Sequence, residues 1–285
     1  MNQVAIVTDS TSDLDATDAQ ARGITVVPLF VNFGDTRFRD QLDLTREQFY
    51  ELLAHDSALP TTTQPTPAMF EEAFRPLVRA GRPIVCVTIT QSLSGTINAA
   101  NTAAKAFPEA EIFVIDSGTV AGGLAIQAQH ANDLARDGAE AATIVAALEN
   151  DYATLRGFAT VPDLSHAVRT GRISRAKAFL GSALKIVPVL RVDSGKIDEH
   201  ARVRTFGRAL DAMVDAAALE ANKADGAYVC VMHARAAIDA ERVAGKLQEK
   251  LTTRPRLFET LEAGPVIGTH AGQGAVGLFV IPGSL

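Results

Sequence analysis

Short apolar segments and helix-forming segments alternate along the first half of the chain, and this alternation restricts the fold more than any other feature. Apolar runs at residues 4–7, 24–31, 84–90 and 111–116 have the length of strands, and helical segments lie between and after them. Strands that alternate with helices are typical of a parallel sheet, because each parallel connection needs a crossover. We therefore expect an N-terminal α/β domain with a parallel sheet of about four strands and flanking helices.

The second half of the chain follows a different pattern, in which extended segments follow one another more closely. Asp193-Ser194-Gly195 has the composition of a turn between two strands. The elements expected in this half are strands at 155–161, 186–192, 196–204, 227–233, 256–262 and 276–281 and helices at 205–222 and 236–250. This pattern predicts a mixed sheet with helices. We place the domain boundary near residue 155, giving domains at 1–155 and 156–285 with the ligand between them.

Composition argues against several classes of protein. Lys plus Arg is 27 and Asp plus Glu is 33, so the net charge of −6 disfavours nucleic-acid binding. No apolar run approaches the ~20 residues of a membrane helix, and the N-terminus lacks a basic leader. The sequence thus predicts a cytoplasmic protein with no transmembrane segment and at most transient membrane contact. Cys86 and Cys230 lie inside apolar runs and are expected as buried, reduced thiols.

Polar residues follow three of the predicted strands of the first half. Segments 8–12, 90–96 and 116–119 are rich in Ser, Thr and Asp, and ligands of parallel sheets bind beyond the carboxyl ends of strands. Asp9, Asp40 and Asp116 could meet at this end of the sheet. The spacing of His, Cys and acidic residues does not resemble a metal site, so no metal is expected.

Ser94 and Gly95 lie at a predicted strand-to-helix junction. A helix N-terminus offers free N–H groups to an anion, and glycine permits a close approach. Ser94 could instead cap its own helix, or act as the nucleophile of a hydrolase. The nucleophile elbow Gly-x-Ser-x-Gly is not matched, because Ser92 and Thr96 stand where glycines are required.

Two further segments carry candidate polar groups. Thr62 and Thr63 lie in a proline-bracketed segment, 60–65, which could donate hydroxyls to an anion or be a solvated turn. Four glycines surround His270 in residues 264–274, which suggests a loop wrapped closely around a ligand. Gly272-x-Gly274-x-x-Gly277 matches a dinucleotide fingerprint only formally, because a strand rather than a helix follows it.

Arginines of the second half could clamp a phosphate or form interdomain salt bridges. These are Arg172, in Gly171-Arg172-Ile173-Ser174, and the later Arg202 and Arg204. The chain has no Gly-x-x-x-x-Gly-Lys-Ser/Thr string, so the sequence offers no recognisable ATP site of its own.

Taken together and in this order, these segments resemble the DegV family. The strings that carry the resemblance are Ile6-Val7-Thr8-Asp9-Ser10-Thr11-Ser12-Asp13-Leu14, Thr62-Thr63-Gln64-Pro65, Leu93-Ser94-Gly95-Thr96, Val114-Ile115-Asp116-Ser117, Gly171-Arg172-Ile173-Ser174, Val203-Arg204-Thr205 and Gly264-Pro265-Val266-Ile267-Gly268-Thr269-His270. They span nearly the whole chain. Thr63 departs from the usual Ser and Gln273 from a common Pro, and residues 168–170 are less basic than in the family.

The resemblance implies a two-domain fold that buries a long-chain fatty acid between its domains. It also implies a non-catalytic role, as the binding subunit of a bacterial fatty acid kinase. A separate kinase protein would phosphorylate the carboxylate, giving an acyl phosphate for phospholipid synthesis. No cofactor is implied besides the bound fatty acid.

Residue roles follow from the same resemblance. Thr62, Ser94 and His270 would contact the carboxylate, and Arg172 and Arg204 would face the kinase or the phosphate. Supporting residues would be Thr63, Gly95, Thr269, Ser10 and Asp116. Two alternatives stay open: a lipid carrier or sensor without a kinase, and a serine hydrolase that uses Ser94 and His270, with Asp116 as a third group.

Overall fold

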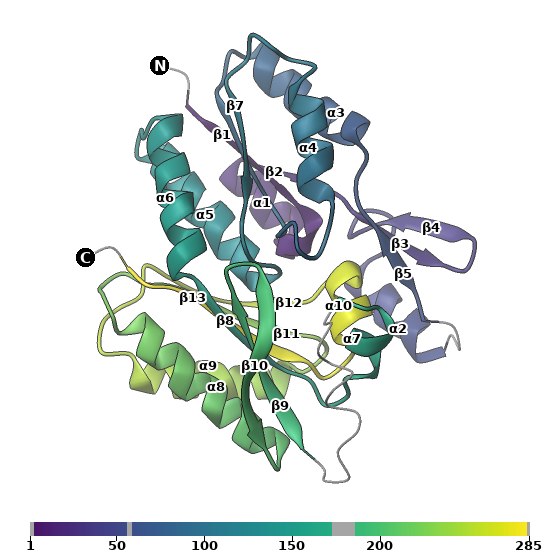
Figure 1. Cartoon of the computed structure of the whole chain (residues 1–285), viewed down its shortest axis with the longest axis vertical. Helices are drawn as coiled ribbons and strands as arrows, with labels where there is room; N and C mark the ends of the chain where they lie inside the picture. The colour runs from purple at the N-terminus through teal and green to yellow at the C-terminus, as the bar shows by residue number, and fades with distance from the viewer. Residues whose placement is uncertain (1–2, 56–58, 173–185, 284–285) are drawn as a thin grey trace.

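The computed structural model describes residues 3–55, 59–172 and 186–283. Its first half is built on a four-stranded sheet in the order β2-β1-β6-β7, in which every pairing is parallel (Figure 1). The strands are β1 (Ala5–Asp9), β2 (Ile24–Val27), β6 (Ile84–Thr88) and β7 (Ile112–Asp116). This confirms the predicted parallel sheet.

Helices cover both faces of this sheet, as Figure 1 shows. They are α1 (Ala16–Arg22), α3 (Pro67–Arg79), α4 (Thr96–Ala104), α5 (Gly122–Arg136) and α6 (Ala141–Thr154). Successive residues of a strand point to opposite faces, so β1 supplies two cores. Ile6 packs with residues of α5 and α6, whereas Ala5 and Val7 pack with residues of α3 and α4.

A small third sheet, which the sequence did not predict, lies beside the first. The expected strand at 24–31 is wrong as one element, because Pro28 separates β2 from β3 (Phe30–Phe33). Proline has no N–H for a strand ladder, so the chain leaves the parallel sheet there. β3 pairs antiparallel with β4 (Thr36–Arg39) and with β5 (Thr61–Thr63). Thr62 thus lies on a strand rather than in the expected loop.

Local sequence signals mark the start of two helices around this sheet. The N–H of Thr45 donates to Gln48 Oε1 (3.0 Å) and the N–H of Gln48 donates to Thr45 Oγ1 (3.2 Å), which together form a capping box before α2 (Arg46–His55). Pro67 is the first residue of α3, where its missing N–H costs nothing, and the Thr66 side chain at the N-cap makes no capping bond.

The second half forms a six-stranded mixed sheet in the order β10-β9-β8-β13-β11-β12. Only the β11–β12 pair is parallel among its five pairings. The strands are β8 (Arg156–Thr160), β9 (Val187–Asp193), β10 (Lys196–Val203), β11 (Tyr228–His233), β12 (Leu257–Glu262) and β13 (Val276–Ile281). This confirms the predicted mixed sheet. Its first strand begins beside residue 155, although the domain boundary itself stays a prediction.

The two faces of the six-stranded sheet have different neighbours. α8 (Phe206–Ala221) and α9 (Ala237–Lys250) cover one face, where Leu278 and Val280 of β13 are buried. Phe279, on the opposite face of the same strand, joins the core that faces the first half. The remaining short helices are η1 (Ser10–Ser12), α7 (Ser165–Arg169) and α10 (Pro265–Ala271).

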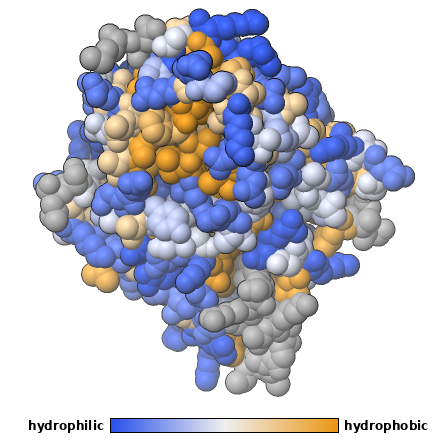
Figure 2. Space-filling view, turned by 45° about the horizontal axis from the view of Figure 1, so that its top comes forward, coloured by the Kyte–Doolittle hydropathy of each residue, from blue (hydrophilic) through white to orange (hydrophobic). Residues whose placement is uncertain are grey.

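Most large apolar side chains lie inside the protein. Figure 2 shows a face that is largely hydrophilic, with apolar residues gathered in its upper part. Cys86 and Cys230 are buried free thiols on strands, as expected, and burial raises the pKa of each. Across the described ranges, no helix combines the length and apolarity that crossing a membrane requires.

Candidate functional site

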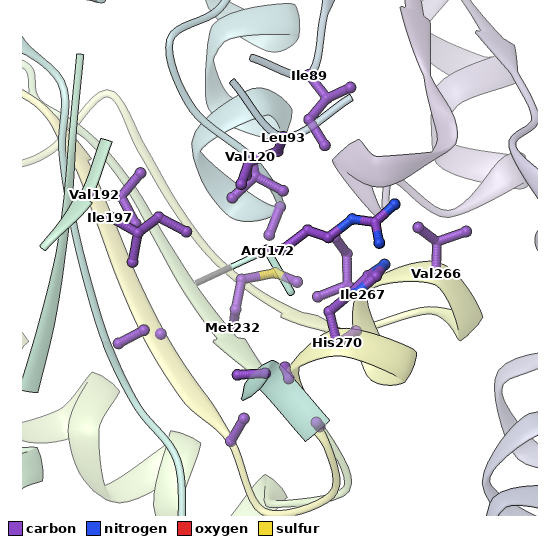
Figure 3. Close-up of a pocket in the computed structure, with 18 of the residues that line it drawn as sticks. Ile89, Leu93, Val120, Arg172, Val192, Ile197, Met232, Val266, Ile267 and His270 are labelled. Atoms are coloured by element: carbon purple, nitrogen blue, oxygen red, sulfur yellow. The ribbon is translucent and has the colours of Figure 1, made fainter. Parts of the chain in front are cut away.

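A cavity of about 520 Å³ lies between the first sheet and the face of the six-stranded sheet that α8 and α9 do not cover (Figure 3). Leu29, Ile89, Leu93 and Val120 line it from the first half, where they follow the ends of parallel strands. This is the expected position for a ligand of a parallel sheet. From the second half the lining includes Ala159, Val161, Leu190, Val192, Met232, Val266 and Phe279.

Polar side chains are few in this lining, and two of the predicted ones are directly paired. Thr62 Oγ1 lies 2.9 Å from His270 Nε2, within hydrogen-bonding distance. Thr62 comes from β5 and His270 from α10, so residues 208 positions apart in sequence form this pair. The unpredicted three-stranded sheet is therefore what brings Thr62 to the cavity.

Ser94 and Gly95 line the same cavity at the start of α4. Gly95 rather than Ser94 is the N-cap, so the alternative in which Ser94 caps its own helix does not hold. Ser94 Oγ instead lies 2.9 Å from Thr96 Oγ1. A Cβ at Gly95 would collide with Gln64 Oε1, so glycine permits this contact. Gln64 also lines the cavity, and sequence reasoning missed it although it lies beside Thr63 in the Thr-Thr-Gln-Pro string.

His270 is neutral at physiological pH. Burial, with a smaller contribution from the positive charge of Arg172, lowers the pKa of His270 to about 4. Its Nδ1 is buried and has no hydrogen-bond partner within the described residues. A neutral imidazole offers one N–H donor and one acceptor. The histidine can therefore donate to an anion without itself carrying charge.

The segment that carries His270 is a helix rather than the expected glycine loop. Residues 265–271 form α10, with Gly264 as N-cap and Pro265 in the first turn. Gly268 lies against α2, where an added Cβ would stand 2.5 Å from Phe49 Cε1 and 3.0 Å from the Tyr50 hydroxyl. The glycines thus permit a close helix–helix approach, which the sequence pattern did not distinguish from a ligand-binding loop.

Two buried carboxyl groups hold the beginning of α10. Asp13 Oδ1 accepts the N–H of Gly264 (2.9 Å), and Asp40 Oδ1 accepts the N–H of Val266 (3.4 Å). Burial raises the pKa of Asp40 to about 7, although the Ser10 hydroxyl bond opposes the rise. Burial, and next the charge of Asp40, raise the pKa of Asp13 well above its usual range.

The Asp40→Asn variant should change how stability depends on pH. In the folded protein Asp40 binds its proton more tightly than in the unfolded chain, whose carboxyl pKa is about 4. This group therefore lowers the free energy of unfolding as pH rises from about 4 to about 7. We expect the variant's free energy of unfolding, minus that of the wild type, to increase across this window and to level off above it. Urea unfolding at a series of pH values measures this difference.

Subtracting the wild-type value cancels the titrating groups that Asp40 does not influence. Asp13 is not one of them, because the charge of Asp40 raises its pKa, so the smaller rise in the variant adds to the expected increase. The lowered pKa of His270 costs stability below about pH 6.5, but it acts in both proteins. Asp43→Asn is the control, because Asp43 is paired with Arg39 at the surface, which lowers the pKa of Asp43 to about 2. A constant difference for Asp40→Asn between pH 5 and 7 would contradict the expected role of its burial.

The structure brings only some of the predicted supporting residues to the cavity. Thr63 lines it together with Gly95. Thr269, Ser10 and Asp116 are not among the described residues that line it. The Thr269 hydroxyl donates to Pro265 O (2.8 Å), the N–H of Leu29 donates to Ser10 Oγ (3.0 Å), and the N–H of Gly118 donates to Asp116 Oδ1 (2.9 Å). These three side chains hold backbone around the site.

The two predicted arginines differ in position. Arg172 lines the cavity, and Figure 3 shows its side chain in the same part of the cavity as His270. It is exposed, and its Nη1 donates to Thr170 O (2.7 Å). Arg204 is exposed in the turn between β10 and α8 and is not among the lining residues that the structure describes. Ile173 and Ser174, quoted beside Arg172, lie outside the described residues.

The groups of the serine hydrolase alternative do not pair with one another. In the part of the chain that the structure describes, Ser94 Oγ bonds Thr96 and His270 Nε2 bonds Thr62. A nucleophilic serine needs a base within hydrogen-bond reach. The described residues contain no group of three or more His, Cys, Asp or Glu side chains arranged to hold a metal ion.

Comparison with known proteins shows which family this chain resembles. A family model described as an uncharacterised protein of the DegV family matches residues 3–283. A DegV domain-containing protein of Halalkalibacterium halodurans is 34% identical over 279 residues, covering 98% of each chain.

Solved structures of similar proteins share the fold. A structure described as showing fatty acid binding of a DegV family protein from Thermus thermophilus has a TM-score of 0.92 at 27% identity, over 99% of this chain and 100% of that one. DegV of Bacillus subtilis, described as a fatty acid binding protein, has a TM-score of 0.87 at 29% identity, over 98% and 99% of the two chains.

Proposed function

The chain belongs to the DegV family, and from its cavity we propose that it binds one long-chain fatty acid and presents the carboxylate to a separate ATP-dependent kinase. The observation that carries the proposal is an apolar cavity of about 520 Å³ with a Thr62–His270 pair in its wall. The relatives whose structures are described as fatty acid binding support it. In this proposal residues 1–155 and 156–285 are two domains that hold the ligand between them.

The apolar lining supplies the affinity. At about 0.8 kcal/mol per buried CH₂, a chain of about sixteen carbons gains on the order of 10 kcal/mol before the costs of association. The side chains around it are mostly Leu, Ile, Val, Ala, Met and Phe. They offer the acyl chain no hydrogen bonds, so the polar side chains must orient the ligand.

Neutral donors would hold the carboxylate. The hydroxyls of Thr62 and Ser94 and an N–H of the uncharged His270 ring would donate to its oxygens. Burying a carboxylate is costly unless such donors satisfy it. Because none of the three is a cation, the oxygen that attacks the terminal phosphorus of ATP would keep more of its electron density.

The kinase half of the proposal rests on the family resemblance and on two exposed arginines. Arg172 lies at the cavity and would meet the transferred phosphate, and Arg204 would contact the kinase. Arginine binds phosphate well because its planar fork offers two parallel donors. A kinase that consumes ATP works in the cytoplasm, so the proposal places this protein there.

Mass spectrometry of the protein purified from a bacterial host tests the binding. We expect the native mass to exceed the denatured mass by one fatty acid, which solvent extraction then identifies. A protein that is empty and also fails to take up added long-chain fatty acids would overturn the proposal. A fluorophosphonate probe tests the hydrolase alternative on the same sample, because covalent labelling of Ser94 would favour that reading.

Turnover separates a kinase subunit from a simple carrier. The loaded protein is mixed with a bacterial fatty acid kinase and ATP, and acyl phosphate is trapped with hydroxylamine. Hydroxamate formation that requires both proteins supports presentation to a kinase. The kinase must first be shown to be active on its own partner protein. If the fatty acid bound to this protein then stays unmodified, the role as a kinase subunit is refuted and the proposed fatty acid binding still stands.

A further inference from the structure

The cavity floor is built from cross-strand rows of the six-stranded sheet, and side-chain size changes from one row to the next. In one row Leu190, Ala159, Gly277 and Met232 are consecutive partners. All four line the cavity. Ala159 and Gly277 occupy its centre, so the floor is low there. An acyl chain can lie directly over the backbone of β8 and β13.

The next row, two residues away along each strand, places three large side chains against the cavity. It consists of the partners Ile197, Val192, Gly157, Phe279 and Cys230. Ile197, Val192 and Phe279 line the cavity. Residues two apart in a strand point to the same face, so these side chains rise from the same floor as Ala159 and Gly277.

This bulky row is distant from the polar end of the cavity. α10 ends at Ala271, and Ala275, just before β13, lines the cavity near that end. Phe279 lies four residues beyond Ala275, a strand distance of roughly 13 Å. Figure 3 shows Val192 and Ile197 on the opposite side of the cavity from His270 and Val266.

The Phe279 ring fits closely against the backbone of three glycines. A Cβ on Gly157 would stand 2.7 Å from the ring, and a Cβ on Gly122 or Gly123 would stand 2.9 Å from it. The ring therefore fills space that three residues without side chains leave open. Phe279 is also 3% exposed, so outside the cavity its ring has no solvent-filled space into which to rotate.

The Val192–Ile197 pair is held by the turn that joins β9 to β10. The N–H of Gly195 donates to Gly118 O (2.6 Å), and the Tyr152 hydroxyl donates to Ser194 O (3.3 Å). The Ser92 hydroxyl also bonds Gly195 O. These contacts tie the hairpin tip to the loops of the first sheet. The cross-strand pair is therefore fixed against the cavity rather than free to move outward.

We propose that Phe279, Val192 and Ile197 form an end wall that sets the length of the acyl chain this protein accepts. The inference rests on the proposed fatty acid binding and adds its length limit. A chain that reaches the wall buries all its methylenes, whereas a longer one must bend or leave atoms in water. Each methylene that fits contributes about a fourfold change in affinity.

Competition among saturated straight-chain fatty acids of graded length tests the wall. Phe279→Ala opens space toward Cys230, so we expect the preferred length to increase, with about fourfold higher relative affinity for each extra methylene accommodated. Ile197→Phe extends the wall and should shift the preference to shorter chains. Leu278→Ala is the matched control: it removes an equally buried side chain of β13 on the opposite face.

The outcomes separate the wall from the binding function. Opposite shifts in the two variants, with the wild-type length profile kept in Leu278→Ala, support the wall. If Phe279→Ala does not fold, Ile197→Phe decides alone, because its position is only partly buried. Loaded variants with an unchanged length profile overturn the wall and leave fatty acid binding intact. A wild-type protein that binds no fatty acid refutes the proposed function instead.

Discussion

The Thr62→Val variant should bind a long-chain fatty acid about 10- to 100-fold more weakly than the wild-type protein. Valine keeps the shape of threonine and suits strand β5, but it removes the hydroxyl that lies 2.9 Å from His270 Nε2. A hydrogen bond to a charged group contributes about 1.5–3 kcal/mol, which corresponds to this loss in affinity. Titration of the delipidated protein with a fluorescent fatty acid measures it.

Thr62→Ser is the matched control, because serine retains the hydroxyl and loses only a methyl group. Its affinity should remain within a few-fold of that of the wild type. The thermal unfolding of both variants should also stay close to the wild type, since Thr62 is partly exposed. Equal affinities of Thr62→Val and Thr62→Ser would contradict the assignment of the Thr62 hydroxyl to the carboxylate.

The same reasoning applies to the other two donors. Ser94→Ala and His270→Ala each remove one group that would meet the carboxylate, and each should reduce kinase-dependent acyl-phosphate formation. Wild-type turnover in these two variants and in Thr62→Val would show that the carboxylate binds elsewhere in the cavity.

The Gly268→Ala variant should lower the free energy of unfolding by about 1–3 kcal/mol, which is the usual cost of overpacking a core. The new methyl group would stand 2.5 Å from Phe49 Cε1, and Phe49 is fully buried. Tyr50, also in contact, donates its hydroxyl to Ala263 O (3.0 Å), so α2 cannot yield without losing that bond. Urea unfolding measures the change, and fatty acid affinity should fall too because α10 carries His270.

Gly245→Ala is the control for this change, because the same substitution is made in a helix without a steric conflict. Gly245 lies inside α9, is exposed, and an added Cβ would have no heavy atom within 4 Å. Alanine is the better helix former, so this variant should gain up to about 1 kcal/mol. A Gly268→Ala protein that is as stable as Gly245→Ala would show that α2 and α10 can separate without cost.

Local patterns in the sequence were enough to predict the four-stranded parallel sheet and the six-stranded mixed sheet. The apolar run at β1 is short, is followed by a polar segment and alternates with helices, a pattern that is typical of a parallel sheet. The capping box at Thr45 and Gln48 is likewise a property of four consecutive residues. Features of this kind depend on backbone geometry over a few residues, which the sequence itself encodes.

The candidate site depended on contacts between distant segments. Residue types marked Thr62, Ser94 and His270 as candidates, but only the packing of β5 beside α10 brings Thr62 and His270 within 2.9 Å of each other. Ser10 and Asp116 are not among the described residues that line the cavity, although their sequence positions resemble that of Ser94.

The sequence by itself thus determined the fold class, the capping box of α2 and the residue types available for binding. Tertiary structure decided that the chain passes from one sheet to another at Pro28. It also decided that the glycine-rich segment 264–274 contains a packed helix. It further decided that the Phe279 ring lines the cavity where Gly157 leaves space for it. The physical reason is that strand pairing and side-chain packing join residues far apart in the chain, so no local pattern specifies which partners will meet.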